Sequence, residues 1–256
     1  MYKTILVDHD LKHGFITITL NRPQKRNAVS LELASELNQA LDLAQQENGL
    51  KFLVITGTGF KAFCSGGDLY DFHGDMDEEE SYQVLNRMKE VLFKLATFPL
   101  PTICILNGDA RGGGCELATA CDFRFAKSGT KHGFVQGKLG IIPGWGGGVL
   151  LHKKIEHSLA YYWLVTSDIF EVETLQQWGW AQAIYHDEIE VEQLLTPFIQ
   201  KHPEQLEILK SQHVHQSSYQ DLYEEMNQEV RQCARLWPSE EHKKAVKAFF
   251  NTRKNK

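Results

Sequence analysis

The sequence predicts an α/β protein in which strands alternate with helices and two glycine-rich turns follow strands. The first observation is a series of short apolar, β-branched runs, among them residues 15–20, 52–56 and 99–106. The second is the glycine cluster at residues 112–114, which precedes apolar residues at helical spacing. Repeated crossovers from strand to helix favour a parallel sheet with helices packed on it.

Composition and charge argue against several classes of function. The formal net charge of −6 and the pI of about 6.0 give no support for a nucleic-acid partner or an anionic membrane. No apolar run is long enough to cross a bilayer, and the first residues lack the pattern of a secretory leader, so we expect a soluble, cytoplasmic protein. The five cysteines lie mostly in apolar segments without a Cys-x-x-Cys pair, which indicates reduced core residues.

The N-terminal part predicts a hairpin followed by a helix. Residues 2–7 and 15–20 alternate in polarity, and Pro23 prevents the second strand from continuing. Ser30 is the expected N-cap of a helix whose apolar stripe runs through residues 33–44.

The middle of the chain repeats this arrangement. Residues 52–56 form a short apolar strand of the kind buried between layers, and the glycine pair at 66–67 follows the next strand. We expect the acidic segment 71–80 to be a surface loop without the ligand order of a calcium site, and residues 81–95 to form a helix.

The C-terminal part is predominantly helical. A last short strand is expected at residues 181–185, and the pattern is helical throughout from residue 191. The expected division is therefore a core of residues 1–190 and a helical region of residues 191–256. The aromatic side chains between Tyr161 and Phe250 exceed what one layer of helices can hide, which indicates oligomer contacts.

Two glycine corners on neighbouring strands can present two backbone N–H groups to one oxygen atom. Consecutive glycines carry no Cβ, so a ligand can approach the main chain closely, and a following helix adds the positive end of its dipole. This is the requirement of an oxyanion hole. Glu116 lies in the first turn of the helix after the second corner, within reach of a substrate bound there. The alternative is a tight strand-to-helix connection with a surface glutamate.

Four motifs in order resemble the crotonase (enoyl-CoA hydratase/isomerase) superfamily over nearly the whole chain. They are Asn21-Arg22-Pro23 with Asn27-Ala28, Phe63-Cys64-Ser65-Gly66-Gly67-Asp68-Leu69, Gly112-Gly113-Gly114-Cys115-Glu116-Leu117 with Cys121-Asp122, and Leu139-Gly140-Ile141-Ile142-Pro143-Gly144 with Gly146-Gly147. The resemblance implies a spiral of ββα repeats and a C-terminal helical region used to form a homotrimer or a dimer of trimers. It also implies an acyl-CoA thioester substrate whose oxygen is held as an enolate by the N–H groups of Gly67 and Gly113, with Glu116 as acid/base residue.

The resemblance further implies which residues contact the substrate. The CoA contacts would be Lys25, Arg26, Ala28, Ser65, Gly66, Asp68, Leu69 and Lys254, and the acyl pocket would be formed by Pro143, Gly144 and Trp145. The alternative for the three cations is solvated charge, and for Trp145 a core aromatic. We expect no metal and no cofactor besides the coenzyme A of the substrate, because neither a dinucleotide fingerprint nor a phosphate loop occurs.

One position departs from the family's hydratases. Gln136 stands where they carry a second glutamate, and an amide neither takes nor gives a proton at neutral pH. Hydration uses two carboxylates, whereas decarboxylation needs enolate stabilisation and one proton. Residues 141–147 and Leu236-Trp237-Pro238 also resemble the ethylmalonyl-/methylmalonyl-CoA decarboxylase branch. We therefore favour decarboxylation of a malonyl-type acyl-CoA, with a hydratase or isomerase that uses Glu116 as the alternative.

A different class of function stays open beside these reactions. The same fold can serve a non-catalytic acyl-CoA-binding or scaffold protein, although the retained Glu116 favours an enzyme. The basic residues near the C-terminus do not alternate with aromatic residues, so RNA binding is not expected.

Overall fold

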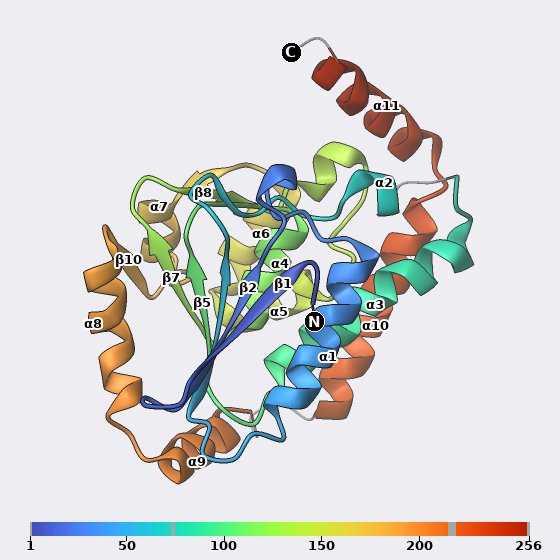
Figure 1. Ribbon diagram of the computed structural model, residues 1–256. Coiled ribbons are helices and arrows are strands. Elements are labelled where there is room, and N and C mark those ends of the chain that lie inside the picture. Colours follow the sequence, from blue (N-terminus) through green and yellow to red (C-terminus); the bar gives the residue numbers. More distant parts are fainter. Residues whose placement is uncertain (1, 73–74, 215–218, 255–256) are drawn as a thin grey trace.

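The computed structural model describes residues 2–72, 75–214 and 219–254 and confirms the α/β prediction (Figure 1). The strands are β1 (Ile5–Asp10), β2 (Phe15–Leu20), β3 (Phe52–Gly57), β4 (Ala62–Cys64), β5 (Thr102–Leu106), β6 (Asp109–Arg111), β7 (Phe123–Lys127), β8 (Lys131–Gly133), β9 (Phe170–Glu171) and β10 (Ala183–Tyr185). The helices are η1 (Pro23–Lys25), α1 (Leu31–Ala44), α2 (Leu69–Phe72), α3 (Glu78–Ala96), α4 (Gly113–Ala120), η2 (Val135–Leu139), α5 (Gly147–Lys154), α6 (His157–Thr166), α7 (Val172–Gln177), α8 (Glu188–Ile199), α9 (Pro203–Val214), α10 (Tyr219–Leu236) and α11 (Glu240–Lys254).

The strands form two sheets that are built by repeats. The larger sheet has the order β1-β2-β3-β5-β7-β10, and the smaller has the order β4-β6-β8-β9. β1 and β2 form the expected antiparallel hairpin, and the other neighbours in the larger sheet are parallel. Each of the pairs β3 and β4, β5 and β6, and β7 and β8 places one strand in each sheet before a helical segment, which gives the ββα repeat.

Helices cover both faces of the larger sheet. Leu53 and Ile55 of β3 face the core that α1 and α3 complete, whereas Phe52 and Val54 face a second core that includes Leu195 of α8. Successive strand residues point to opposite faces, so a strand covered on both sides is apolar throughout, as residues 52–55 are. In Figure 1, α1, α3 and α10 lie side by side at the right of the sheet and α8 lies at the left.

The strand before the second glycine corner differs from the sequence expectation. The run 99–106 does not lead into the corner: β5 ends at Leu106, and the chain crosses to the smaller sheet as the separate strand β6. The crossing is narrow, because a Cβ added to Gly108 would lie 2.6 Å from the backbone nitrogen of Ala62. The predicted strand thus combines two strands that belong to different sheets.

The acidic segment expected to be a loop contains the start of α3. Asp77 accepts the N–H of Glu80 at 2.9 Å, and the Glu80 side chain accepts the N–H of Asp77 at 3.0 Å. This reciprocal capping box satisfies two N–H groups at the helix end. The carboxylates of the first turn also stabilise the helix, because they lie at the positive end of its dipole. The prediction was wrong for residues 71–72, which end α2, and for residues 78–80, which begin α3; residues 73–74 lie outside the described ranges.

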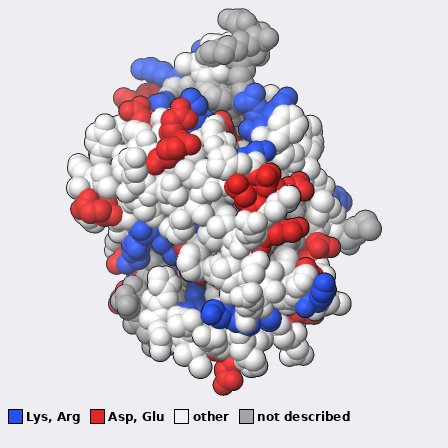
Figure 2. Space-filling model, turned by 90° about the vertical axis from the view of Figure 1, so that its left-hand side faces the viewer, with Lys and Arg blue, Asp and Glu red and all other residues white. Residues whose placement is uncertain are grey.

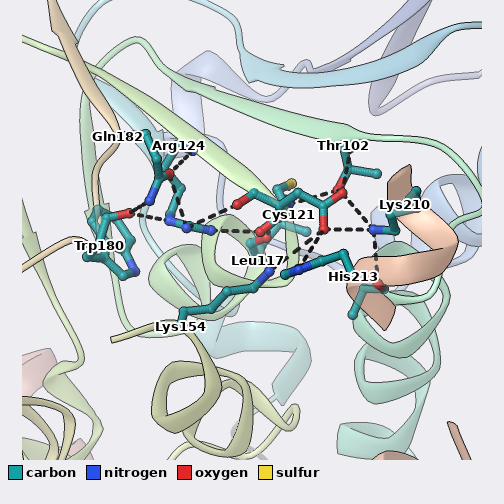
Figure 3. A network of polar contacts seen from close by, with 11 residues as sticks. Thr102, Leu117, Cys121, Arg124, Lys154, Trp180, Gln182, Lys210 and His213 are labelled. Carbon is teal, nitrogen blue, oxygen red and sulfur yellow. Dashed lines mark hydrogen bonds and ion pairs between the residues drawn. The ribbon is translucent and has the colours of Figure 1, made fainter. Parts of the chain in front are cut away.

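The C-terminal end of α4 is fixed by a buried arginine (Figure 3). Arg124, 1% exposed, donates to the backbone oxygens of Cys121 at 2.6 Å and of Trp180, and to Oε1 of Gln182 at 3.1 Å. Cys121 and Trp180 are buried, so their backbone oxygens need a partner within the protein. Arg124 therefore joins the end of α4 to the segment that leads into β10.

Asp122 adds an ion-pair cluster beside this arginine. Its carboxylate lies 2.6 Å from Nζ of Lys210 on α9 and 3.7 Å from Nζ of Lys154 on α5, and it accepts the N–H of Thr102 at 2.9 Å. Burial alone would raise the pKa of Asp122, but the two lysines hold it below its ordinary value. The cluster ties the helices α5 and α9 and the start of β5 to the far end of the helix that begins at the second glycine corner.

Two expectations about the C-terminal part of the chain stay predictions. After β10 the described chain contains only helices, but the division at residue 190 and a role of residues 191–256 in trimerisation are untested. Within the described ranges, no helix has both the length and the apolar composition that crossing a bilayer requires. Figure 2 shows acidic and basic side chains interspersed over one face of the molecule.

Candidate active site

The two glycine corners lie against each other because β4 and β6 are parallel neighbours. Gly66 and Gly112 have φ values of 92° and 52°, which side chains rarely tolerate. A Cβ added to Gly66 would lie 3.3 Å from the backbone nitrogen of Gly113, and one added to Gly114 would lie 2.2 Å from the oxygen of Cys64. The corners therefore pack backbone to backbone, and glycine is required for this contact.

The two expected oxyanion donors face one cavity. Gly67 and Gly113 both line a cavity of about 790 Å³, a volume within the range of small-molecule sites. Gly113 is the first residue of α4, where helical N–H groups lack intrahelical acceptors. Within the described ranges, no hydrogen bond uses the N–H of Gly67 or of Gly113. Both groups are therefore available to a ligand in this part of the chain.

Most residues expected from the sequence line this cavity. They are Lys25, Arg26, Ala28, Ser65, Gly66, Gly67, Asp68, Leu69, Gly113, Glu116, Gln136, Gly144 and Trp145. Lys25 and Arg26 are exposed, and Nζ of Lys25 lies 5.2 Å from the centre of the Tyr70 ring. The side chain of Lys254 lies outside the described part of the structure.

Two expected substrate contacts have other roles in the structure. Pro143 is buried but does not line the cavity; it lies beside the first turn of α5, where its Cγ is 3.5 Å from a Cβ added to Gly148. Asp68 reaches the cavity wall, but its carboxylate pairs with Arg22 at 2.9 Å and accepts the N–H of Tyr70 at 3.2 Å. These bonds fix the first glycine corner, so the carboxylate is not free for coenzyme A.

Glu116 occupies the inner end of the cavity and is 2% exposed. Its Oε1 accepts Nε2 of Gln136 at 2.8 Å and the N–H of Gly144 at 3.4 Å. Its Oε2 accepts the N–H groups of Trp145 at 2.9 Å and of Gly147 at 3.0 Å. Four donors thus occupy the four lone-pair directions of the carboxylate. The bond from Gly144 is the longest and is the first to be exchanged for another partner.

The surroundings of Glu116 place its proton exchange closer to neutral pH. Burial raises the pKa of Glu116 above its ordinary value, and the hydrogen bonds from Trp145, Gly147, Gln136 and Gly144 offset only part of this shift. A raised pKa is typical of a group that transfers protons in a cleft. The surface glutamate considered as the alternative is thereby excluded.

Trp145 is a core residue and a cavity wall at once. It is 4% exposed, and its ring lies so close to Gly113 that an added Cβ there would be 2.1 Å from Cζ3. The ring centre lies 5.7 Å from that of Phe72. Trp145 is thus the core aromatic of the alternative, and packing on the second corner also brings its ring to the cavity; contact with an acyl group stays a prediction.

Several cavity residues had no signal in the sequence. The wall includes Phe72, Leu85, Cys233, Trp237, Phe249 and Phe250. The last four come from α10, α11 and the short link between them, which holds Trp237, more than 100 residues after α4. Nothing local marks a residue whose contact depends on the docking of a distant helix, and only the helical stripe of α10 is visible before folding.

Comparison with known proteins assigns the chain to a protein family. A model of the enoyl-CoA hydratase/isomerase family matches residues 10–256. The chain belongs to this family. Among curated members, it is 37% identical over 147 residues to mouse methylglutaconyl-CoA hydratase, a match that covers 57% of this chain and 46% of that protein. It is 35% identical over 142 residues to ethylmalonyl-CoA decarboxylase of Xenopus tropicalis, covering 55% of this chain and 47% of that protein.

The fold is shared with solved members of the family. The structure of an enoyl-CoA hydratase from Bacillus halodurans matches with a TM-score of 0.88 at 22% identity, over 96% of this chain and all of that one. The predicted crotonase-like fold is confirmed. Because the match spans about half the length of each of the two curated relatives, their reactions are evidence for a proposal about this chain and not an assignment.

Proposed function

We propose that this chain is an enzyme that acts on an acyl-CoA thioester, holds the thioester oxygen as an enolate with the N–H groups of Gly67 and Gly113, and transfers one proton through Glu116. Among reactions of this kind we favour the decarboxylation of a malonyl-type acyl-CoA. The observation that carries this preference is the hydrogen bond from Gln136 to Glu116, a neutral amide in direct contact with the acid/base carboxylate.

The proposed reaction needs only groups present in the cavity. The bond between the α-carbon and the substrate carboxylate breaks, carbon dioxide leaves, and the electron pair moves onto the thioester as an enolate. Two backbone N–H donors aimed at the oxygen stabilise this charge, and each is typically worth about 2.7–4 kcal/mol in the transition state. Glu116, whose pKa burial raises, then takes up a proton from solvent and passes it to the α-carbon.

Hydration requires more catalytic groups in the same site than decarboxylation does. It requires a carboxylate with a free lone pair to hold and activate water, and a second acid to protonate the α-carbon. Both oxygens of Glu116 already accept two donors each, and Gln136 supplies no second proton. The similarity to methylglutaconyl-CoA hydratase nevertheless supports a hydratase or isomerase that uses Glu116 alone as the second candidate.

The mouth of the cavity fits the rest of the substrate. Lys25 and Arg26 are positioned to meet phosphate oxygens, while Phe72, Leu85 and Trp145 offer an apolar inner end to a short acyl group. We propose no metal and no cofactor beyond the coenzyme A of the substrate. We also propose a homotrimer or a dimer of trimers in the cytoplasm, which sedimentation of the purified protein tests.

A panel of thioesters tests the proposed function. Purified protein is incubated with malonyl-, methylmalonyl-, ethylmalonyl- and crotonyl-CoA, and the products are separated and carbon dioxide is measured. We expect carbon dioxide from at least one malonyl-type thioester and slow or absent hydration of crotonyl-CoA. Hydration of crotonyl-CoA without any decarboxylation would establish the second candidate, and binding without turnover of any thioester would establish a non-catalytic protein.

A further inference from the structure

A second buried carboxyl group lies behind the candidate active site. Glu229 of α10 is 8% exposed, and its Oε2 accepts the N–H of Val149 at 2.8 Å. The carboxyl group lies close to the backbone at the start of α5, since a Cβ added to Gly148 would lie 2.6 Å from Oε2. Its Oε1 is buried and has no hydrogen-bond partner within the described ranges. Buried polar atoms without a partner are uncommon and call for an explanation.

Glu116 and Glu229 hold two parts of one backbone segment, residues 144–149. Glu116 accepts the N–H groups of Gly144, Trp145 and Gly147, and Glu229 accepts that of Val149. The two carboxyl groups reach the segment from α4 and α10, on either side of the start of α5. Glycines make this approach possible, since a Cβ added to Gly147 would lie 2.3 Å from Cγ of Glu116.

We propose that Glu229 is a positioning residue of the active site: it fixes the half of segment 144–149 that Glu116 does not reach, and so keeps Trp145 and the Glu116 carboxylate in place beside Gly113. Its effect on turnover rests on the proposed function, whereas its effect on the segment and on stability does not. Cys233, one turn later on α10, strengthens the attachment because its thiol donates to the oxygen of Ile142 at 3.2 Å.

The surroundings of Glu229 decide which carboxyl group of the pair carries the charge. Burial, and then the neighbouring Glu116, raise the pKa of Glu229 to about 8. Besides Glu116 of α4, the ionisable groups on α10 and on the helices packed against it include Glu90 of α3, His152 of α5, Glu225, Arg231 and Cys233 of α10, and four lysines. The lysines all pair with other carboxylates: Lys89 with Glu90 at 2.7 Å, Lys153 with Glu225 at 2.8 Å, Lys94 with Asp42, and Lys154 with Asp122 at 3.7 Å.

At neutral pH Glu229 therefore keeps its proton and the pair carries a single negative charge. Glu116 is the member that holds this charge best, because it accepts the side-chain N–H of Gln136 in addition to three backbone donors. A second carboxyl group that stays neutral can hold the segment without repelling either Glu116 or a negatively charged substrate.

This arrangement fixes the sign of a pH effect on stability. The pKa of Glu229 is about 8 in the folded chain against an ordinary value of 4.5, so the folded chain binds more protons between these values. The contribution of Glu229 to stability is complete below pH 4.5 and is lost as the pH rises towards about 8. A glutamine has no such loss. The difference in Tm between Glu229→Gln and the wild type should therefore grow across this range and then level off.

Two substitutions and a control test the proposal. Glu229→Gln keeps an acceptor for Val149, Glu229→Ala removes it, and Glu225→Gln changes an exposed carboxylate one turn earlier on the same helix. We expect Glu229→Ala to speed hydrogen exchange in residues 144–149 and to lower kcat about ten-fold or more, since misplacing catalytic groups by 1 Å can cost about 10²-fold. Glu229→Gln should keep slow exchange and near-normal kcat at neutral pH and show the rising Tm difference. Glu225→Gln should show none of these changes.

The outcomes separate this proposal from the proposed function. Unchanged exchange of segment 144–149 in Glu229→Ala, or a Tm difference in Glu229→Gln that is independent of pH, would overturn the positioning role. Should Glu229→Ala fail to fold, the Glu229→Gln comparison still decides. A wild-type protein that turns over no thioester would instead contradict the proposed function, and the exchange and Tm measurements would continue to judge Glu229.

Discussion

Helix α4 has a buried carboxylate near each end, and the structure compensates the two in opposite ways. Asp122, just beyond the C-terminal end, pairs with Lys210 at 2.6 Å and Lys154 at 3.7 Å. Glu116, in the first turn at the N-terminal end, has no ion-pair partner in the described ranges and is held by backbone and amide N–H groups beside the carboxyl group of Glu229.

The difference separates a structural charge from a chemical one. The two lysines lower the pKa of Asp122, so it stays ionised and its ion pairs hold the helices together. Neutral donors leave the pKa of Glu116 above its ordinary value, which is typical of a group that transfers protons. The carboxylates of Asp122 and Glu116 are nearly equally buried. The opposite shifts of their pKa values therefore come from the groups around them.

The largest expected effect is a loss of folding stability when the ion pairs of Asp122, at the C-terminal end of α4, are broken. Asp122→Asn leaves Lys210 and Lys154 buried without a carboxylate, and breaking a buried pair costs about 3–5 kcal/mol. Denaturant unfolding measures this loss. The matched control is Asp42→Asn, whose ion pair with Lys94 is exposed and should be worth about 0–1 kcal/mol. Equal losses in the two variants would remove the distinction between the ends of α4.

Glu229→Gln sharpens the same contrast, because both substitutions replace a buried carboxyl group by an amide. Asp122→Asn should destabilise the protein, whereas Glu229→Gln should stabilise it or leave it unchanged at neutral pH. A loss in both would mean that Glu229 is ionised in the folded chain.

The sequence predicted those parts of the site whose signals are local. The corners at Gly66 and Gly112, Glu116 one turn later, and the Ser30 cap each follow from neighbouring residues; in the structure, Ser30 Oγ accepts the N–H of Leu33 at 3.1 Å. The α/β class follows in the same way from repeated apolar runs.

The remainder depends on distant packing and could not be predicted from local patterns. Glu229 reads as a surface residue of an amphipathic helix until α10 docks beside α5. The separate strands β5 and β6 look like one strand, because the change of sheet takes place at Asn107-Gly108, which is also an ordinary turn pair. Asp68 looks like a ligand contact until Arg22 pairs with it.

Gly113→Ala probes the N-terminal end of α4. The new Cβ would lie 2.1 Å from the Trp145 ring, so the ring must move and the oxyanion corner must distort. We expect turnover of every thioester to fall together by about 10²–10³-fold, as for loss of an oxyanion donor. Gly129→Ala is the control for backbone strain away from the cavity: nothing lies within 4 Å of its added Cβ, but its φ of 74° favours glycine, so it should cost stability and not turnover. Full activity in a folded Gly113→Ala protein would show that the donor is elsewhere.

Glu116→Gln tests the proton transfer itself. Removing an acid/base group typically lowers turnover by about 10²-fold or more, while binding of the CoA moiety at the cavity mouth should persist. Steady-state kinetics and calorimetric binding of a thioester measure the two effects separately. Turnover that survives the substitution would leave Glu116 with only the structural role of capping α5.

The most direct test of the account is Gln136→Glu, which adds a carboxylate 2.8 Å from the one already present. Like charges about 4 Å apart at an effective dielectric of about 20 repel by about 4 kcal/mol, so a substrate carboxylate should bind less well and decarboxylation should fall. The new acid should create or raise hydration of crotonyl-CoA. The measurement is kcat/KM for a malonyl-type thioester and for crotonyl-CoA on both proteins. The account predicts opposite changes, and a wild-type protein that hydrates crotonyl-CoA rapidly with Gln136 in place would contradict it.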